Sequence, residues 1–337
     1  MKPISQLANQ LFQPNGPTTD TPLELGSNLF PNFRLVAEVA PDQKSHNSKR
    51  IGQVPLKQAS VAILQRKTAE ALDRANAANQ SVLKLVFDQW NDSKRGVPNP
   101  LIRSGLFTTR VSEARATIKA EKIASLSNVD ILYTGEELRQ DDLTVWLSIC
   151  NLGRNQPLGD PIYFTGYKLL KDMQWRMHSD SYEKLRGSIA RLKVTSIQIT
   201  QKNGRAGYAG SLIRDYAFDA RDVNGRESFV VRLEPSVASL FGFDDTTLLE
   251  WNQRIRIGTK ASLTLFLHAF YSSHQEPIPY SIAKLFELCK SEQKAYRNFK
   301  IRMRVSLETL ITIGFLHSYV INKDIVHVKR LSFAVLN

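Results

Sequence analysis

One order of secondary-structure elements is predicted twice along this chain, and this repeat constrains its fold more than any other feature. The short helical patterns FTGYKLLKDMQW (164–175) and YSIAKLFELC (280–289) both contain Lys-Leu followed by Leu or Phe. A longer helical pattern follows each one, SYEKLRGSIARLKVTSI (181–197) and KIRMRVSLETLITIGFL (300–316), and then a hairpin. Short helix, turn, longer helix and hairpin is the order of a winged helix-turn-helix domain. Two unrelated helical hairpins are the alternative.

Both longer helices carry an apolar stripe at spacings of three and four residues, which predicts the buried side of each. The stripes are Tyr182, Leu185, Ile189 and Leu192 in the first helix, and Tyr296, Phe299, Met303, Leu307 and Leu310 in the second. The opposite sides carry Lys184, Gly187 and Arg191, and Lys294, Arg297 and Arg304 with Asn298 at the edge. Arg and Asn pair with guanine and adenine in the DNA major groove, although an ordinary solvated face is the alternative. Ile301 falls on the same basic side and favours neither interpretation unless it contacts a thymine methyl group.

The two predicted hairpins add basic residues near their turns. QKNGRAGYAG (201–210) is a glycine-rich loop that predicts a wing touching phosphate, and INKDIVHVKR (321–330) predicts the second wing. The candidate DNA-binding residues are Ser181, Lys184, Arg191, Lys202, Arg205, Lys294, Arg297, Asn298, Arg304, Lys323, Lys329 and Arg330.

The fold class predicted is α+β, with two tandem winged helix-turn-helix domains after an N-terminal extension. The length of 337 residues fits about two domains. Residues 1–55 lack a sustained apolar period and are predicted to be mostly disordered, while 56–100 are predicted as a helix followed by a linker at NDSKRGVPNP (91–100). The first winged-helix domain is expected over 101–235 and the second over 236–337, with Pro235 at the boundary.

Within these domains, alternation and helical periodicity predict the individual elements. Strands are expected at 105–110, 129–134, 161–164, 194–201, 207–218, 227–233, 315–321 and 325–330. Helices are expected at 141–153, 166–174, 180–193, 245–257, 260–272, 281–289 and 292–313.

The charge of the chain indicates an anionic partner. The formal net charge is +13 and the isoelectric point is near 9.7, which favours nucleic acid first and an anionic membrane surface second. No apolar run approaches the roughly 18 residues of a membrane span, and the N-terminus does not have the pattern of a secretion signal. Cys150 and Cys289 are expected as buried, unpaired thiols. A cytoplasmic protein is expected.

The sequence gives little support for an enzyme, a metal site or a cofactor. Its six histidines form neither H-x-H nor H-E-x-x-H, which disfavours a nicking enzyme with metal-binding histidines. The acidic cluster in TGEELRQDDL (134–143) places Asp141 and Asp142 ahead of an apolar helical pattern. Acidic side chains are favourable in the first turn of a helix, so the cluster predicts a helix start rather than a hydrolytic site. Changing both residues to Asn is expected to lower stability slightly.

Several stretches, in the same order along the chain, resemble the TrfA family of plasmid replication initiators. They are RSGLFTTR (103–110), YTGEELRQDD (133–142) followed by VW (145–146), PLGDPIYFTGYKLLKDMQW (157–175), YSSHQEP (271–277) and DIVHVKR (324–330). The resemblance implies a protein with two winged-helix domains that binds direct repeats, called iterons, at a plasmid origin. It also implies help in melting DNA, recruitment of the host replicative helicase and host initiator proteins, and a monomer–dimer equilibrium that controls copy number.

Members of that family carry a sliding-clamp motif of the form Q-L-S-L-F before the first domain. The corresponding stretch here, VLKLVFDQW (82–90), has Leu83, Leu85 and Phe87 but no leading Gln. QLANQLF (6–12) is a second candidate, and an apolar patch packing on this protein itself is the alternative for both.

Two other functions compete with a replication initiator. A winged-helix transcriptional repressor would share the DNA chemistry, but it would act as a stable dimer on a palindrome without unwinding DNA. A nucleic-acid enzyme such as a nicking protein would cut supercoiled plasmid in the presence of a divalent metal.

Overall fold

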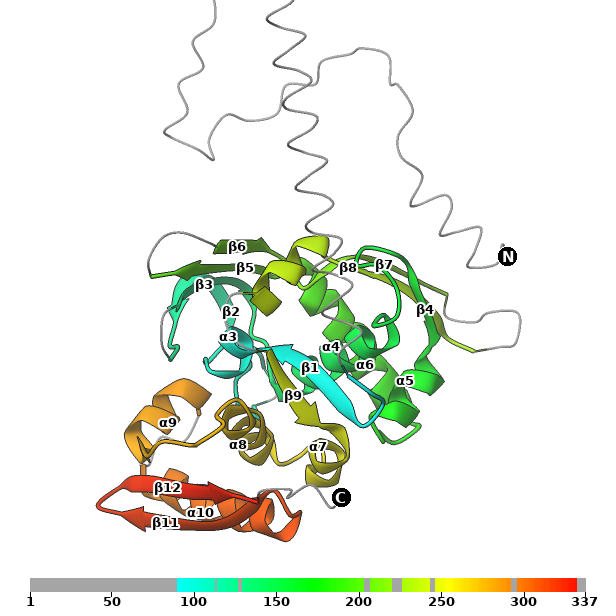
Figure 1. The fold of residues 1–337 in the computed structure, drawn as a ribbon. Helices are drawn as coiled ribbons and strands as arrows, with labels where there is room; N and C mark the ends of the chain where they lie inside the picture. The colour runs from blue at the N-terminus through cyan, green and yellow to red at the C-terminus, as the bar shows by residue number, and fades with distance from the viewer. Residues whose placement is uncertain are drawn as a thin grey trace, which may run out of the picture. The chain divides into compact units, whose positions relative to one another are not determined.

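The computed structural model describes residues 90–112, 114–126, 129–202, 207–219, 226–242, 246–291 and 296–331 (Figure 1). The helices, including the 3-10 helix η1, are α3 (Asn99–Ile102), α4 (Gln140–Leu152), α5 (Gly166–Asp172), α6 (Ser179–Val194), η1 (Pro235–Gly242), α7 (Trp251–Ile257), α8 (Ser262–Ser272), α9 (Ile282–Cys289) and α10 (Tyr296–Thr312). The strands are β1 (Lys94–Pro98), β2 (Thr117–Ile123), β3 (Val129–Glu136), β4 (Ile162–Thr165), β5 (Ser196–Gln201), β6 (Gly207–Gly210), β7 (Ile213–Asp219), β8 (Ser228–Leu233), β9 (Thr246–Glu250), β10 (Tyr280–Ser281), β11 (Leu316–Asn322) and β12 (Ile325–Arg330). The predictions for 1–55 and for the helix over 56–87 fall outside the described residues.

Each short helix of the predicted repeat begins directly at the end of a strand. β4 leads into α5, and β10 leads into α9. In both cases a hydroxyl at the N-cap accepts a backbone hydrogen bond, Thr165 Oγ1 from Lys168 at 3.2 Å and Ser281 Oγ from Lys284 at 3.1 Å. Such caps satisfy N–H groups that have no partner inside the helix. The two copies therefore share their local geometry as well as their order.

Two three-stranded antiparallel sheets complete the repeat and have the same strand order. They run β4–β8–β7 in the first half and β10–β12–β11 in the second. In each sheet, the strand before the short helix pairs with the last strand of the hairpin. The order helix, strand, short helix, longer helix and hairpin thus occurs twice among the described residues, from α4 to β8 and from α8 to β12.

The hairpin that was expected to form the first wing belongs to a different sheet. β5 and β6 flank the glycine-rich loop, but they extend the four-stranded sheet β2–β3–β5–β6. The hairpin that matches β11–β12 is instead β7–β8, whose two strands the sequence predicts separately. The hairpin at 201–210, which was expected to be the first wing, is thus not the counterpart of β11–β12, because β5–β6 is inserted between α6 and β7.

Residues expected to form a linker are instead part of a sheet. β1 pairs antiparallel with β9 from Lys94 opposite Glu250 to Pro98 opposite Thr246 (Figure 1). The strand is buried from Arg95 onward, so Gly96 and Pro98 do not mark an exposed linker. β9 also replaces the first part of the helix expected at 245–257, of which only α7 is helical.

The two apolar cores divide the chain near the end of α7. The first core runs from Trp90 to Trp251 and also takes in Ala269, while the second runs from Ile257 to Val326. The expected boundary at 235 instead falls at the start of η1, whose apolar side chains are buried in the first core.

Most of the other expected elements are present in the structure. Residues 105–110 form no strand, and the strand expected at 207–218 is divided into β6 and β7. The elements α3, β2, η1 and β10 were not expected. Cys150 and Cys289 are buried and unpaired, as predicted. Among the described residues, no helix is both long and apolar enough to cross a membrane.

Candidate nucleic-acid interface

Helix α10 presents a cationic side to solvent at the edge of the second half. Its apolar stripe is buried at Phe299, Met303, Leu307 and Leu310, although Tyr296, predicted as part of the stripe, is 38% exposed. Arg297, Asn298 and Arg304 are exposed on the other side. Neither arginine makes an ion pair or a side-chain hydrogen bond with any other described residue, so both guanidinium groups are available to a ligand.

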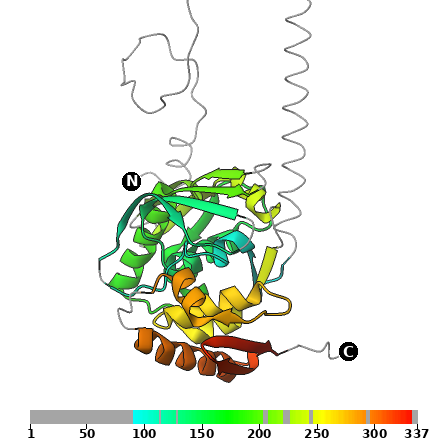
Figure 2. The same ribbon diagram turned by 90° about the vertical axis from the view of Figure 1, so that its left-hand side faces the viewer.

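The hairpin β11–β12 lies beside α10 (Figure 2). Lys323 and Asp324 in its turn both have positive φ, 47° and 65°, the backbone shape of a tight type I′ turn. Asp324 forms an ion pair with Lys300 of α10, with 2.6 Å between Nζ and Oδ2, and this contact holds the turn against the helix. Lys323 and Lys329 are exposed.

Arg330 faces inward, in contrast to the lysines of the same hairpin. Its guanidinium donates to the carbonyl oxygens of Ser272 and His274, at 3.4 and 3.0 Å, and lies over the ring of Phe315. The sequence predicts a DNA contact for Arg330, but the structure uses this side chain to join β12 to the end of α8.

The predicted DNA-facing side of α6 is occupied by contacts within the protein. Lys184 Nζ lies 3.0 Å from Asp141 and 4.8 Å from the centre of the Trp175 ring. Arg191 binds Asp142 Oδ1 through Nε at 3.1 Å and through Nη2 at 2.9 Å, and its side chain is 13% exposed. The sequence predicts a DNA contact for Arg191, whereas the structure holds its guanidinium inside the protein, because a buried carboxylate requires opposite charge nearby.

The acidic cluster starts a helix, as predicted. Asp141 and Asp142 lie in the first turn of α4, and Asp142 completes a capping box by accepting from the Arg139 backbone N–H at 2.8 Å. Burial pushes the pKa of Asp141 upward, but the nearby charges of Lys184 and Arg115 outweigh it and lower this pKa below the ordinary value. The Asp141 carboxylate therefore stays ionised at neutral pH and anchors α6 through Lys184.

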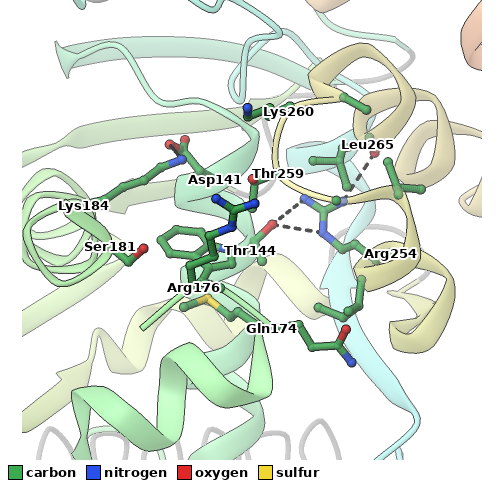
Figure 3. A pocket seen from close by; sticks show the side chains of 16 residues that line it. Asp141, Thr144, Gln174, Arg176, Ser181, Lys184, Arg254, Thr259, Lys260 and Leu265 are labelled. Atoms are coloured by element: carbon green, nitrogen blue, oxygen red, sulfur yellow. Dashed lines mark hydrogen bonds and ion pairs between the residues drawn. The ribbon is translucent and has the colours of Figure 1, made fainter. Parts of the chain in front are cut away.

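A hollow of about 660 Å³ opens between the two halves (Figure 3). Ser181 and Lys184 of α6 line it together with Lys260 from the turn between α7 and α8, and no lining residue comes from α10. Arg254 also lines it. This arginine donates only to neutral oxygens such as Thr144 Oγ1, and burial lowers its pKa to about 9. The candidate residues of α6 thus lie apart from the exposed side of α10.

The remaining candidates are not brought to this surface by the described structure. Lys202 is exposed at the end of β5, in the inserted hairpin. Arg205, Lys294 and the candidate clamp residues Leu83, Leu85 and Phe87 lie outside the described residues.

One residue on the exposed side of α10 was missed from the sequence. Val305 lies one turn after Ile301, and the two side chains are 61% and 51% exposed. Its exposure could have been predicted from its position in the helix, because residue 305 falls outside the buried stripe of Phe299, Met303 and Leu307.

No metal centre accompanies this surface, since the described residues contain no group of three or more His, Cys, Asp or Glu placed to hold an ion. An exposed cationic helix beside a hairpin that carries further lysines is the kind of surface found on nucleic-acid-binding proteins.

The family is identified by comparison with known proteins. The model of the family described as TrfA protein matches residues 53–330, and the chain belongs to this family. The resemblance drawn from the sequence motifs is thereby confirmed.

Individual relatives and solved structures are more distant. The chain is 29% identical over 288 residues to the plasmid replication initiator protein TrfA of Escherichia coli, which covers 84% of this chain and 73% of that protein. A solved structure of domains 2 and 3 of RctB has a TM-score of 0.48 at 12% identity and covers 68% of this chain and 97% of its own. A second RctB structure of these domains has a TM-score of 0.46 at 13% identity, with 66% and 92% covered.

Proposed function

We propose that this protein is a plasmid replication initiator that binds direct repeats of duplex DNA at the origin, with α10 as its main base-reading helix. The observation that carries the proposal is the pair of exposed arginines on α10, Arg297 and Arg304, neither of which makes an ion pair or a side-chain hydrogen bond with another described residue. Arginine donates two parallel hydrogen bonds to guanine in the major groove and also binds phosphate. Membership of the TrfA family supports the same function.

The order of elements supports two winged-helix domains. In such domains the second helix of the pair reads the major groove and the hairpin touches the backbone. The corresponding elements are α10 with β11–β12 in the second half, and α6 with β7–β8 in the first. Because the cations of α6 are paired within the protein, the second domain supplies most of the base contacts in this proposal.

The protein acts without chemistry of its own in this proposal. Distorting DNA costs several kcal/mol, which the contacts of two domains can offset, so binding itself can open an adjacent AT-rich segment. The host replicative helicase and initiator proteins are recruited to that segment. Dimers restrain copy number in the cytoplasm, and a contact with the sliding clamp through Leu83, Leu85 and Phe87 is a separate proposal.

The proposal is tested by replacing Arg297 and Arg304 with Ala. We expect a loss of affinity for origin DNA of about 5- to 150-fold for each arginine, since one good contact contributes about 1–3 kcal/mol. Thermal stability should stay near that of the wild type, because both side chains are exposed. A matched control with the same charge change is the double replacement of Lys119 and Lys122, which are exposed on β2. Equal affinity of the two double variants for origin DNA would reject α10 as the reading helix.

The footprint on the origin separates an initiator from its competitors. Protection of tandem direct repeats, with hypersensitivity in neighbouring AT-rich DNA, is expected for an initiator. Protection of one palindrome by a stable dimer would identify a repressor instead. Nicking of supercoiled plasmid with a divalent metal would identify an enzyme.

A further inference from the structure

Two apolar side chains lie side by side in the middle of the cationic side of α10. Ile301 is 51% exposed and Val305 is 61% exposed. They are four residues apart, so they are neighbours on the helix surface. Arg297 lies one turn before Ile301, and Arg304 is adjacent to Val305 in sequence. An apolar pair is thus framed by the arginines that carry the proposed function.

These side chains are not needed to build the domain. The core side of α10 is provided by Phe299, Met303 and Leu307, each with 0% exposure. Ile301 and Val305 project from the other side and belong to neither apolar core. Their exposed apolar surface gains free energy only when a ligand covers it.

The charge around the pair indicates what that ligand is. Helix α10 carries Arg297, Lys300, Arg302 and Arg304 against Glu308, a net charge of +3 (4 − 1). An apolar protein surface placed here would remove water from these cations without supplying opposite charge, which is costly. The ligand must therefore supply negative charge to the cations and an apolar surface to Ile301 and Val305. A polyanion that exposes apolar groups where it meets the helix does both.

We propose that Ile301 and Val305 contact the C5-methyl groups of thymines in the DNA major groove and thereby determine which base pairs α10 accepts. This inference rests on the proposed function of α10. Neither side chain can donate or accept a hydrogen bond, and the thymine methyl is the apolar group that the four ordinary bases present in the major groove. The flanking arginines hold the backbone or a guanine while the apolar pair selects thymine.

The spacing of the pair sets the expected spacing of the thymines. Four residues of helix rise about 6 Å, and successive bases of a strand are about 3.4 Å apart along the duplex axis. Where α10 runs along the groove, the two methyl groups therefore lie about two base pairs apart, on the same or on opposite strands.

The test removes the methyl groups from the DNA and the side chains from the protein. The probe is a duplex that the wild-type protein has selected from a random library, prepared once with thymine and once with uracil, which lacks only the methyl group. For wild-type protein we expect affinity for the uracil duplex to be lower by roughly three- to fivefold per lost methyl contact, the factor expected for burial of one methylene-sized group.

The decisive comparison is with the double variant Ile301→Ala, Val305→Ala. It should bind the thymine duplex more weakly than wild type, and its preference for thymine over uracil should fall towards one. Ile278→Ala serves as the matched control, because Ile278 is 58% exposed in the segment before β10, and it should keep the full thymine preference. Thermal unfolding of both variants should match the wild type, so a change in binding is not a change in folding.

A thymine preference of the same size in the double variant and in the wild type would overturn the inference. The inference also fails if the double replacement changes the oligomeric state of the free protein and leaves the thymine preference unaltered, since the pair would then contact protein. Failure of the proposed function gives a different result, because the wild-type protein would then select no sequence from the library.

Discussion

Asp142 shows how one buried carboxylate connects three parts of the first half. It is 0% exposed and accepts four hydrogen bonds: from Arg115, from the backbone of Arg139, and two from Arg191. The capping role could be predicted from sequence because it is local. The bonds to Arg115 and Arg191 could not, because they join residues 27 and 49 positions away. These bonds also explain why α6 keeps Arg191 inside the protein.

Replacing Asp142 with Asn should therefore destabilise the protein far more than a lost helix cap would. We expect a loss of about 3–5 kcal/mol in the free energy of unfolding, because Arg115 and Arg191 are partly buried and would lose the buried charge that both bind, keeping only the contacts with Asp141 and Glu136. The sequence alone suggested a slight effect. Chemical denaturation measures the difference, with the exposed Asp160→Asn as control, expected within about 0.5 kcal/mol of wild type. A similar small change in both variants would contradict the anchoring role of Asp142.

At the scale of elements, the two hairpins of the first half could not be told apart from sequence. Both are short alternating runs joined by a few polar or glycine residues, and such runs do not reveal which strands they pair with. The structure decides by pairing, since β8 lies between β4 and β7 just as β12 lies between β10 and β11. The connection between β7 and β8 is thus the wing of the first domain in the proposed function, and the loop between β5 and β6 is not.

A pair of arginines tests this reassignment, one from each hairpin connection. Arg221 lies in the sequence between β7 and β8, and Arg205 lies between β5 and β6. We expect Arg221→Ala to weaken DNA binding and to reduce the slope of log K against log salt by about 0.9, the value for one phosphate contact. Arg205→Ala should leave both unchanged. The opposite outcome would restore the glycine-rich loop as the wing.

The long helices were predictable because their apolar stripes report burial directly. Phe299, Met303, Leu307 and Leu310 are buried as their spacing predicts, and so are Leu185, Ile189 and Leu192. The strand β1 was not predictable, because Gly96 and Pro98 indicate a turn and its partner β9 lies about 150 residues further along the chain. On α6 and α10, the sequence places a cation on the side opposite the apolar stripe but cannot say whether a distant carboxylate binds it. For this reason the sequence could not tell Arg191, which binds Asp142, from Arg297, which is exposed.

At the scale of the whole described chain, the two halves are joined by contacts at several places. Ser262 donates to the Thr109 carbonyl at 2.8 Å, Arg103 donates to Ser273 Oγ at 3.0 Å, and Lys290 pairs with Glu121 at 2.7 Å. Buried contacts of this kind couple the folding of the parts that they join. In the proposed function, two winged-helix units with such connections would present their helices at a fixed spacing, which suits DNA sites on one face of a duplex.

Arg95 lies within the first half and offers a test of this coupling, because weakening one half should lower the stability of both halves if they are coupled. It is 2% exposed in β1, binds Asp172 at 2.9 Å, and stacks over the ring of Trp251 at 4.4 Å. Arg95→Ala removes a buried charge and stacking partner, so we expect a loss of about 2–4 kcal/mol in stability.

The shape of the unfolding transition then decides between coupled and independent halves. If the contacts between the halves couple them, tryptophan fluorescence and far-ultraviolet circular dichroism should report one shared midpoint, which falls as a unit in the variant. Arg95→Lys keeps the charge but not the planar contact with Trp251, so its midpoint should lie between those of the wild type and Arg95→Ala. Two separate transitions, with only one of them shifted in the variant, would show that the halves fold independently. Independent folding is what the domain division expected from the sequence, with a linker at residues 91–100 and a boundary at 235, would suggest.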